Sequence, residues 1–213
     1  SVGGAIIDSG RFDWTAAGKF PALTEPEPAY HGLKFHETFG PMAFTFHGIA
    51  IGLRDLGMTM APMSAFQTLL GIETLSLRME RHVRNAEKIA AWLEADPRVT
   101  EVTYAGLPSS PWYERAKRLY PKGAGALFTS GVRGADEAGT RLVNSVEIFS
   151  HVVNLGDTRS IINHPASTTH RQLTPEQQEA AGAGPDTVRL SIGIEDADDL
   201  IRDLDQALAR ATA

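Results

Sequence analysis

The sequence contains no cysteine among its 213 residues. This absence excludes disulfide bonds and thiolate metal ligands within the chain, and it fits a cytoplasmic protein. No run of lysine or arginine occurs, and 20 basic residues are mixed with 26 acidic ones for a formal net charge of −6. Such a pattern lacks the positive surface that nucleic acid requires. No apolar stretch reaches the roughly eighteen residues of a membrane span. We therefore expect a cytoplasmic protein with neither nucleic acid nor membrane as a partner.

What is present is a globular composition, with 42% hydrophobic and 22% charged residues. The apolar run at 2–8 predicts a buried strand, and a long loop rich in proline and aromatic residues follows from 9 to 39. Because nothing precedes this strand to cover it, we expect the natural chain to start earlier. Helical patterns at 41–56 and 64–95 follow, and the second is long enough to connect two domains. These patterns place a domain boundary near residue 70.

The rest of the chain alternates between strand and helix patterns. We expect strands at 99–103, 124–130 and 187–192, and helices at 112–120, 135–149, 175–181 and 197–211. The segment between residues 150 and 174 is expected to be irregular. Mixed order of this kind is typical of an α+β arrangement.

The strand at 187–192 carries the most informative charged residue. Alternation places Val188, Leu190 and Ile192 on one face of the strand and Arg189 with Ser191 on the other. A guanidinium in so apolar a strand needs an anionic partner, since burying it alone is costly. Its planar shape suits two-point binding of a carboxylate. The pattern leaves two partners open: the α-carboxylate of a substrate, or a structural ion pair with Asp or Glu.

The segment 154–170 is dense in small hydrogen-bonding side chains, which suits the wall of a pocket. Its two histidines, His164 and His170, lie six residues apart and match neither common helical spacing of metal ligands, so no metal site is predicted. No serine lies in a Gly-x-Ser-x-Gly pattern, and a serine hydrolase is not favoured. Turn and loop hydrogen bonds remain the alternative explanation for these polar residues.

Several long motifs in order carry a resemblance to a known family. They are SVGGAIIDSGRFDW, FPALTEPEPAYHGLKFHETFGPMAF, LLGIETLSLRMERH, NLGDTRSIINHPASTTHRQLTPEQ and VRLSIGIEDADDLIRDLDQAL. Together they resemble the cystathionine synthase and lyase family of pyridoxal-phosphate enzymes, and within it the O-acetylhomoserine sulfhydrylases. The resemblance implies an α/β and α+β fold, the carboxy-terminal part of an aminotransferase-like type I fold. Residues 1–70 would be a remnant of the cofactor-binding large domain, and 71–213 the small domain with its long connecting helix.

The resemblance also implies roles for four residues. Arg189 falls on the arginine that binds the α-carboxylate of the substrate, and Asn154 falls where many relatives have a serine that assists it. Thr169 falls on the residue that supports this arginine, and Val153 on a position that varies with substrate choice. The implied activity is formation of L-homocysteine from O-acetyl-L-homoserine and sulfide by a homotetramer. Alternatives are a cystathionine γ-synthase or γ-lyase of the same family, or a noncatalytic fragment or interaction module.

The largest departure from the family pattern is the missing Schiff-base lysine. The family carries it in a Ser-x-Thr-Lys motif, which this sequence lacks, and the lysines present occur in unrelated contexts: Lys19, Lys34, Lys88, Lys117 and Lys122. We therefore expect no catalytic residue in this chain and a need for the amino-terminal part of the large domain. Pyridoxal phosphate is expected in the intact enzyme, whereas this chain alone is expected neither to bind it nor to be active.

Overall fold

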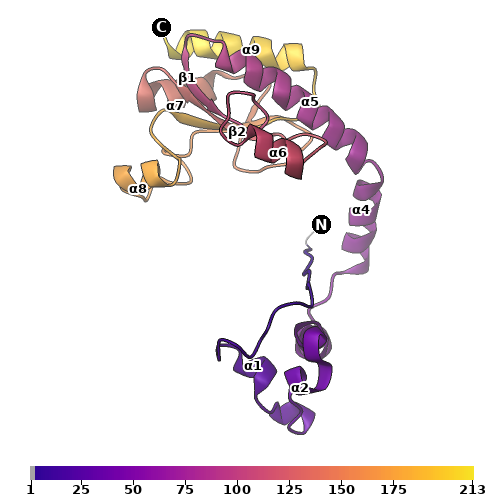
Figure 1. The fold of residues 1–213 in the computed structure, drawn as a ribbon. Helices are drawn as coiled ribbons and strands as arrows, with labels where there is room; N and C mark the ends of the chain where they lie inside the picture. The colour runs from indigo at the N-terminus through magenta and orange to yellow at the C-terminus, as the bar shows by residue number, and fades with distance from the viewer. Residues whose placement is uncertain (1–2) are drawn as a thin grey trace. The chain divides into compact units, whose positions relative to one another are not determined.

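The computed structural model describes residues 3–213, which form two compact units that divide between Glu73 and Thr74 (Figure 1). The first unit is helical, and the second contains a five-stranded sheet. No helix of the described residues is both long enough and apolar enough to cross a membrane.

The first unit is built from short helices around a small aromatic core. Its elements are α1 (Pro21–Thr24), η1 (Pro28–Tyr30), α2 (Phe35–Phe39), η2 (Gly40–Met42), α3 (Ala43–His47), the π-helical η3 (Gly48–Asp55) and α4 (Pro62–Glu73). Leu23, Phe35 and Ala43 are buried at its centre, and Trp14 stacks on Phe44 with ring centroids 5.2 Å apart. The expected long loop therefore contains two short helices and a 3-10 turn.

The strand expected at the start of the chain is not formed. Val2 lies outside the described residues, and residues 3–9 have no regular structure. Ile6 and Ile7 are 83% and 92% exposed. This prediction was wrong for the described residues because a strand needs a neighbour for its backbone hydrogen bonds, and none lies alongside these residues.

The second unit contains α5 (Leu75–Glu94), β1 (Val99–Thr103), α6 (Tyr113–Leu119), β2 (Leu127–Val132), α7 (Ala135–Ser145), β3 (Ser150–His151), β4 (Ile161–Asn163), α8 (Pro175–Ala180), β5 (Thr187–Ser191) and α9 (Ala197–Ala211). The strand order is β1-β2-β5-β4-β3, and only the β3–β4 pair is parallel. The most central strand, β5, therefore lies between β2 and β4.

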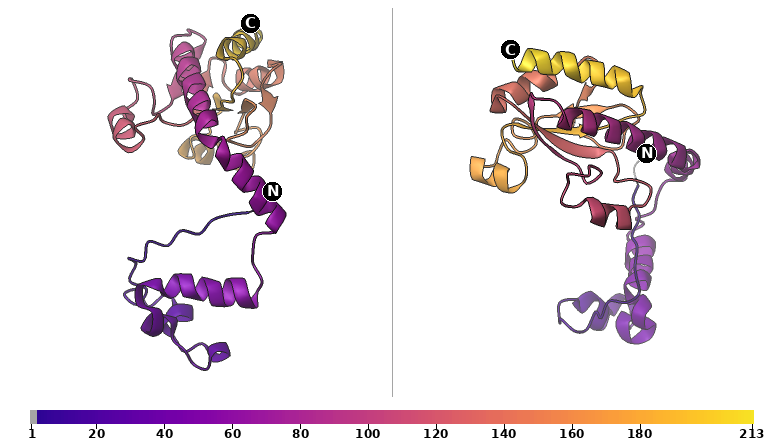
Figure 2. Two further views of the ribbon diagram at one scale, coloured as in Figure 1. Left: turned by 90° about the vertical axis from the view of Figure 1, so that its right-hand side faces the viewer. Right: turned by 45° about the horizontal axis from the view of Figure 1, so that its top comes forward.

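Helices α5, α7 and α9 cover one face of this sheet (Figures 1 and 2). Val188 and Leu190 of β5 are each 1% exposed and share a core with Leu200, Leu204 and Leu208 of α9. Burying leucine side chains of this kind stabilises the fold by roughly 1.5–3 kcal/mol each. Strand alternation sends the intervening residues of β5 to the opposite face, so the core itself fixes where those polar groups lie.

Most of the elements expected in the second unit are confirmed within a few residues, but two predictions need correction. The helix expected at 64–95 is divided into α4 and α5 at Thr74, whose φ of −108° and ψ of 6° leave the helical region. The segment 150–174 is not wholly irregular, because it contains β3 and β4. Strands of two and three residues are too short to show a periodic pattern in a sequence.

Candidate functional site

The site is built on the polar face of β5, opposite the covering helices. Arg189 is half-buried there and lies directly between Thr129 of β2 and Asn163 of β4 in the strand register. Ser191 lies on the same face two residues further along. The alternation predicted for this strand is therefore confirmed, and it gives Arg189 a fixed backbone position in the middle of the sheet.

A loop at residues 152–160 folds over this polar face. Nη2 of Arg189 donates a 2.8 Å hydrogen bond to the carbonyl oxygen of Asn154, and the N–H of Gly156 donates a 3.2 Å bond to Oγ of Ser191. Arg189 and Asn154, which are 35 residues apart, are thus brought into contact. The contact uses the backbone of Asn154 and leaves its side chain uninvolved.

No acidic side chain forms an ion pair with Arg189 within residues 3–213, whose ion pairs join other residues. The structural ion pair that the sequence left open is therefore not formed there. A guanidinium has five N–H donors. Because Asn154 accepts from one of them, Arg189 retains the donors that a carboxylate needs for a two-point contact.

The two other residues singled out by the resemblance lie on either side of β4, Val153 in the loop 152–160 and Thr169 in the turns after the strand. Val153 is 50% exposed and precedes Asn154 in the chain. Thr169 is exposed, and its Oγ1 lies 2.8 Å from Nδ1 of His170. Among the described residues Thr169 forms no hydrogen bond with Arg189, so the support that the resemblance implies for this residue stays a prediction.

The histidines of this segment have structural partners. His164 is fully buried, with Nδ1 2.9 Å from Oγ of Ser167 and Nε2 2.9 Å from the carbonyl oxygen of Pro185. Both ring nitrogens are therefore engaged within the protein. The described residues contain no cluster of three or more His, Asp or Glu side chains that could hold a metal ion.

A hydrogen-bonded group at the end of the loop 152–160 was not predicted from the sequence. Glu195 accepts from the N–H of Ser160 at 2.7 Å and from its hydroxyl at 2.9 Å, and the same Oγ accepts from the N–H of Gly193 at 2.8 Å. Nδ2 of Asn85 donates to the carbonyl oxygens of Gly193 and Glu195. These hydrogen bonds connect the loop 152–160 to the residues that follow β5 and to α5. No local pattern could reveal it, since Ser160 and Glu195 lie 35 residues apart.

Residues 1–209 match the family described as Cys/Met metabolism PLP-dependent enzyme, where PLP is pyridoxal phosphate. The chain belongs to this family. It is 48% identical over 98% of its length to O-acetyl-L-homoserine sulfhydrylase 1 of Thermus thermophilus and 45% identical over 98% to O-acetyl-L-homoserine sulfhydrylase of Leptospira meyeri. The chain spans about half the length of these relatives, 49% in each case.

A solved structure of an O-acetylhomoserine (thiol)-lyase from Campylobacter jejuni has the same fold. Its TM-score is 0.82 at 39% sequence identity, with 92% of this chain and 46% of that chain covered. That protein carries a pyridoxyl-lysine phosphate group. The expected mixed α/β and α+β fold of the pyridoxal-phosphate family, and the resemblance read from the sequence motifs, are therefore confirmed.

Three of the five lysines of this chain contact residues close to them. Lys34 pairs with Glu37 at 2.7 Å, and Lys88 pairs with Asp198 at 2.6 Å. The ammonium group of Lys117 lies 5.1 Å from the ring centre of Tyr113. The Ser-x-Thr-Lys motif that the resemblance implies is absent from this sequence, and these three lysines have other contacts.

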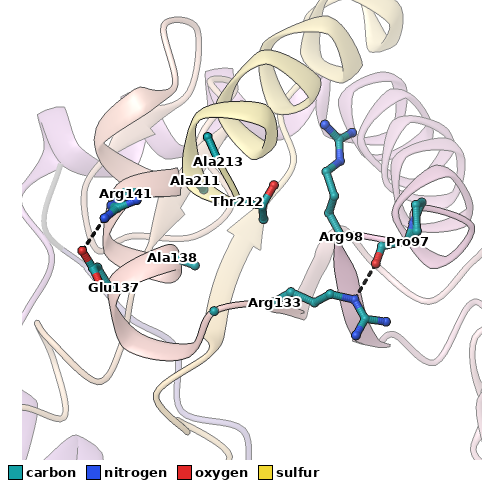
Figure 3. Close-up of a pocket in the computed structure, with 10 residues that line it drawn as sticks. Pro97, Arg98, Arg133, Glu137, Ala138, Arg141, Ala211, Thr212 and Ala213 are labelled. Carbon is teal, nitrogen blue, oxygen red and sulfur yellow. Dashed lines mark hydrogen bonds and ion pairs between the residues drawn. The ribbon is translucent and has the colours of Figure 1, made fainter.

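A hollow of about 620 Å³ elsewhere in the second unit does not include Arg189 (Figure 3). Three arginines line it, and each has a protein partner. Arg98 pairs with Asp96 and Asp205, Arg133 donates to the carbonyl oxygen of Pro97, and Arg141 pairs with Glu137. The hydrogen bonds between their side chains raise the pKa of Arg98 and lower the pKa of Asp96. We therefore regard this hollow as a structural groove.

Proposed function

We propose that this chain is the carboxy-terminal part of an enzyme that makes L-homocysteine from O-acetyl-L-homoserine and sulfide by pyridoxal-phosphate-dependent γ-replacement. The observation that carries the proposal is the position of Arg189, in the middle of a sheet and with no acidic partner among the described residues. The printed names of the relatives support the choice of substrate.

In this proposal Arg189 holds the α-carboxylate of the amino acid by two parallel hydrogen bonds. The loop that carries Val153 and Asn154 lies against it and shapes the space around the side chain of the substrate. Thr169 has the supporting role that the resemblance implies for it. Bound pyridoxal phosphate supplies the electron sink that makes proton removal and loss of acetate possible. The residues of this chain bind and orient the amino acid, which is the positioning that the chemistry of the bound cofactor would require.

The same proposal assigns the residues of this chain to the two domains of the intact enzyme. We assign residues 1–70 to the cofactor-binding large domain and 71–213 to the small domain, and the division between Glu73 and Thr74 supports a boundary in this region. The Schiff-base lysine belongs to a segment outside this chain. The chain alone is then inactive, and the working enzyme is a cytoplasmic homotetramer.

The intact protein should be assayed with O-acetyl-L-homoserine plus sulfide, and separately with cystathionine. Formation of homocysteine from the first pair at a rate well above that with cystathionine is the expected result. Activity confined to cystathionine would replace the proposal with a γ-lyase, and efficient use of cysteine in place of sulfide would favour a cystathionine γ-synthase.

The proposed inactivity of this chain has its own test. Residues 1–213 alone, incubated with pyridoxal phosphate, should give neither homocysteine nor a protein-bound absorbance band of the cofactor after gel filtration. A retained band, or turnover comparable to that of the intact protein, would contradict this part of the proposal.

A further inference from the structure

Asn163 is the direct neighbour of Arg189 on the polar face of the sheet. The two residues are paired in the antiparallel β4–β5 register, so their side chains leave the sheet on the same side. Directly opposed side chains in such pairs have Cβ atoms about 4.5–5.5 Å apart, which is within reach of a shared ligand. Sequence reasoning did not single out Asn163, because strand β4 was not predicted.

The amide of Asn163 is buried with an unused donor. The residue is 1% exposed, and its Nδ2 has no hydrogen-bond partner among residues 3–213. A buried N–H donor without an acceptor destabilises a folded protein, and most such donors in native structures are paired. Such exceptions in folded proteins are expected at functional sites, so the unpaired donor of Asn163 indicates a contact with a ligand.

The position of Asn163 is held firmly by its neighbours. Ile162 before it and His164 after it are both fully buried, and both ring nitrogens of His164 have partners. By contrast, the acceptor that Arg189 contacts is the carbonyl oxygen of Asn154, in a loop whose residues 151–156 are exposed. A ligand carboxylate can therefore take the place of that carbonyl beside Arg189 without any change in the sheet.

We propose that Asn163 is a second donor for the substrate carboxylate that Arg189 binds. Nδ2 of Asn163 donates to one carboxylate oxygen while the guanidinium binds both oxygens from the neighbouring strand. The ligand class is an α-amino acid with a free carboxylate. This inference rests on the proposed function, and it adds a second donor to the proposed carboxylate site.

The test compares Asn163→Leu in the intact enzyme with a matched control, Ser130→Ala. Leucine has nearly the shape of asparagine but no donor. Ser130 is also buried with an unpartnered hydroxyl, yet it pairs with Val188 and so lies on the helix-covered face.

We expect Asn163→Leu to raise KM for O-acetyl-L-homoserine about tenfold, with kcat changed less than about twofold, because one donor to a charged group is lost. Its Tm should stay equal or rise, and Ser130→Ala should leave KM unchanged.

A second variant, Asn163→Asp, places a carboxylate beside the guanidinium. We expect a larger rise in KM than for Asn163→Leu, because this carboxylate competes with the substrate for Arg189. If Asn163→Leu does not fold, Asn163→Ala carries the same prediction for KM. An unchanged KM in these variants, or a fall in Tm with unchanged kinetics, would show that the asparagine has a structural role and overturn the inference.

Arg189→Lys, measured alongside, separates the two proposals. If it raises KM and the Asn163 variants do not, only the role of Asn163 is lost. If Arg189→Lys also leaves KM unchanged, the proposed carboxylate site itself is wrong.

Discussion

The guanidinium of Arg189 donates a 2.8 Å hydrogen bond to the backbone carbonyl of Asn154, which lies 35 residues earlier in the chain. The bond joins the middle of the sheet to the loop over its polar face. Because a carbonyl oxygen is a neutral acceptor, it holds the arginine less strongly than a carboxylate would. The contact orients Arg189 and still allows an anionic ligand to compete for it.

Asn154→Ala should leave the stability of this chain nearly unchanged. The bond to Arg189 uses the carbonyl oxygen, which alanine retains, so we expect a change in the free energy of unfolding within about 0.5 kcal/mol. Urea denaturation followed by circular dichroism measures this change. A loss of more than about 1 kcal/mol would mean that the side chain of Asn154 forms contacts beyond those described.

Glu195→Ala should destabilise the second unit by about 1–3 kcal/mol, because both donors of buried Ser160 lose their charged acceptor. Glu195→Gln is the matched variant, and it should cost less since one of its two terminal atoms still accepts. Denaturation of both variants gives the comparison. Equal effects of the two changes would indicate that packing, and not hydrogen bonding, accounts for the role of Glu195.

Asp96 gives the second unit a pH-dependent contribution to stability. Hydrogen bonds from Arg98 lower the pKa of this carboxyl below its ordinary value of 3.8. A depressed pKa in the folded state means that the contribution is complete above about pH 3.8 and is lost as pH falls through the folded-state pKa. At pH 7, Asp96→Asn should lower the free energy of unfolding by about 1–3 kcal/mol.

The measurement for Asp96 is a series of urea denaturation curves for both proteins between pH 7 and pH 3. The difference between wild type and Asp96→Asn should be constant from pH 7 to pH 5 and shrink below about pH 3.8. A difference that grows on acidification would contradict the assigned direction of the pKa change.

Gly139→Ala should destabilise the protein, although the same change in an exposed helix interior usually stabilises it. A Cβ at position 139 would lie 2.7 Å from Cδ2 of His164, whose ring is fixed by Ser167 and Pro185. Because the ring has no free space to move, we expect a loss of roughly 1–3 kcal/mol. Pairing Gly139→Ala with His164→Ala should recover part of it, and an absence of recovery would assign the loss to another contact.

The helices of the second unit and its longer strands could be predicted from the sequence because their signals are local. Helix α9 shows apolar residues at helical spacing with Asp196 as its N-cap, and α8 begins with a Thr174–Gln177 capping box. Strand β5 shows simple alternation around Arg189, and its bounds were predicted within one residue. Patterns of this kind depend on neighbours within a few positions of each other, which a sequence displays directly.

The parts that could not be predicted depend on contacts between distant segments. Strand β4 is identified by its pairing with β5. Only this pairing shows that Asn163 lies beside Arg189. The bonds between Ser160 and Glu195 likewise join separate segments. The position of Arg189 on the polar face could be predicted, whereas its contact with Asn154 and its pairing with Asn163 could not.

The most direct test of the account is the KM of the intact enzyme for O-acetyl-L-homoserine after Arg189→Lys and Arg189→Ala. Lysine keeps the charge but loses the two-point contact, so we expect KM to rise about tenfold for lysine and about a hundredfold for alanine, with Tm nearly unchanged. Wild-type KM in both variants, with the proteins folded and carrying cofactor, would show that Arg189 does not bind the substrate carboxylate.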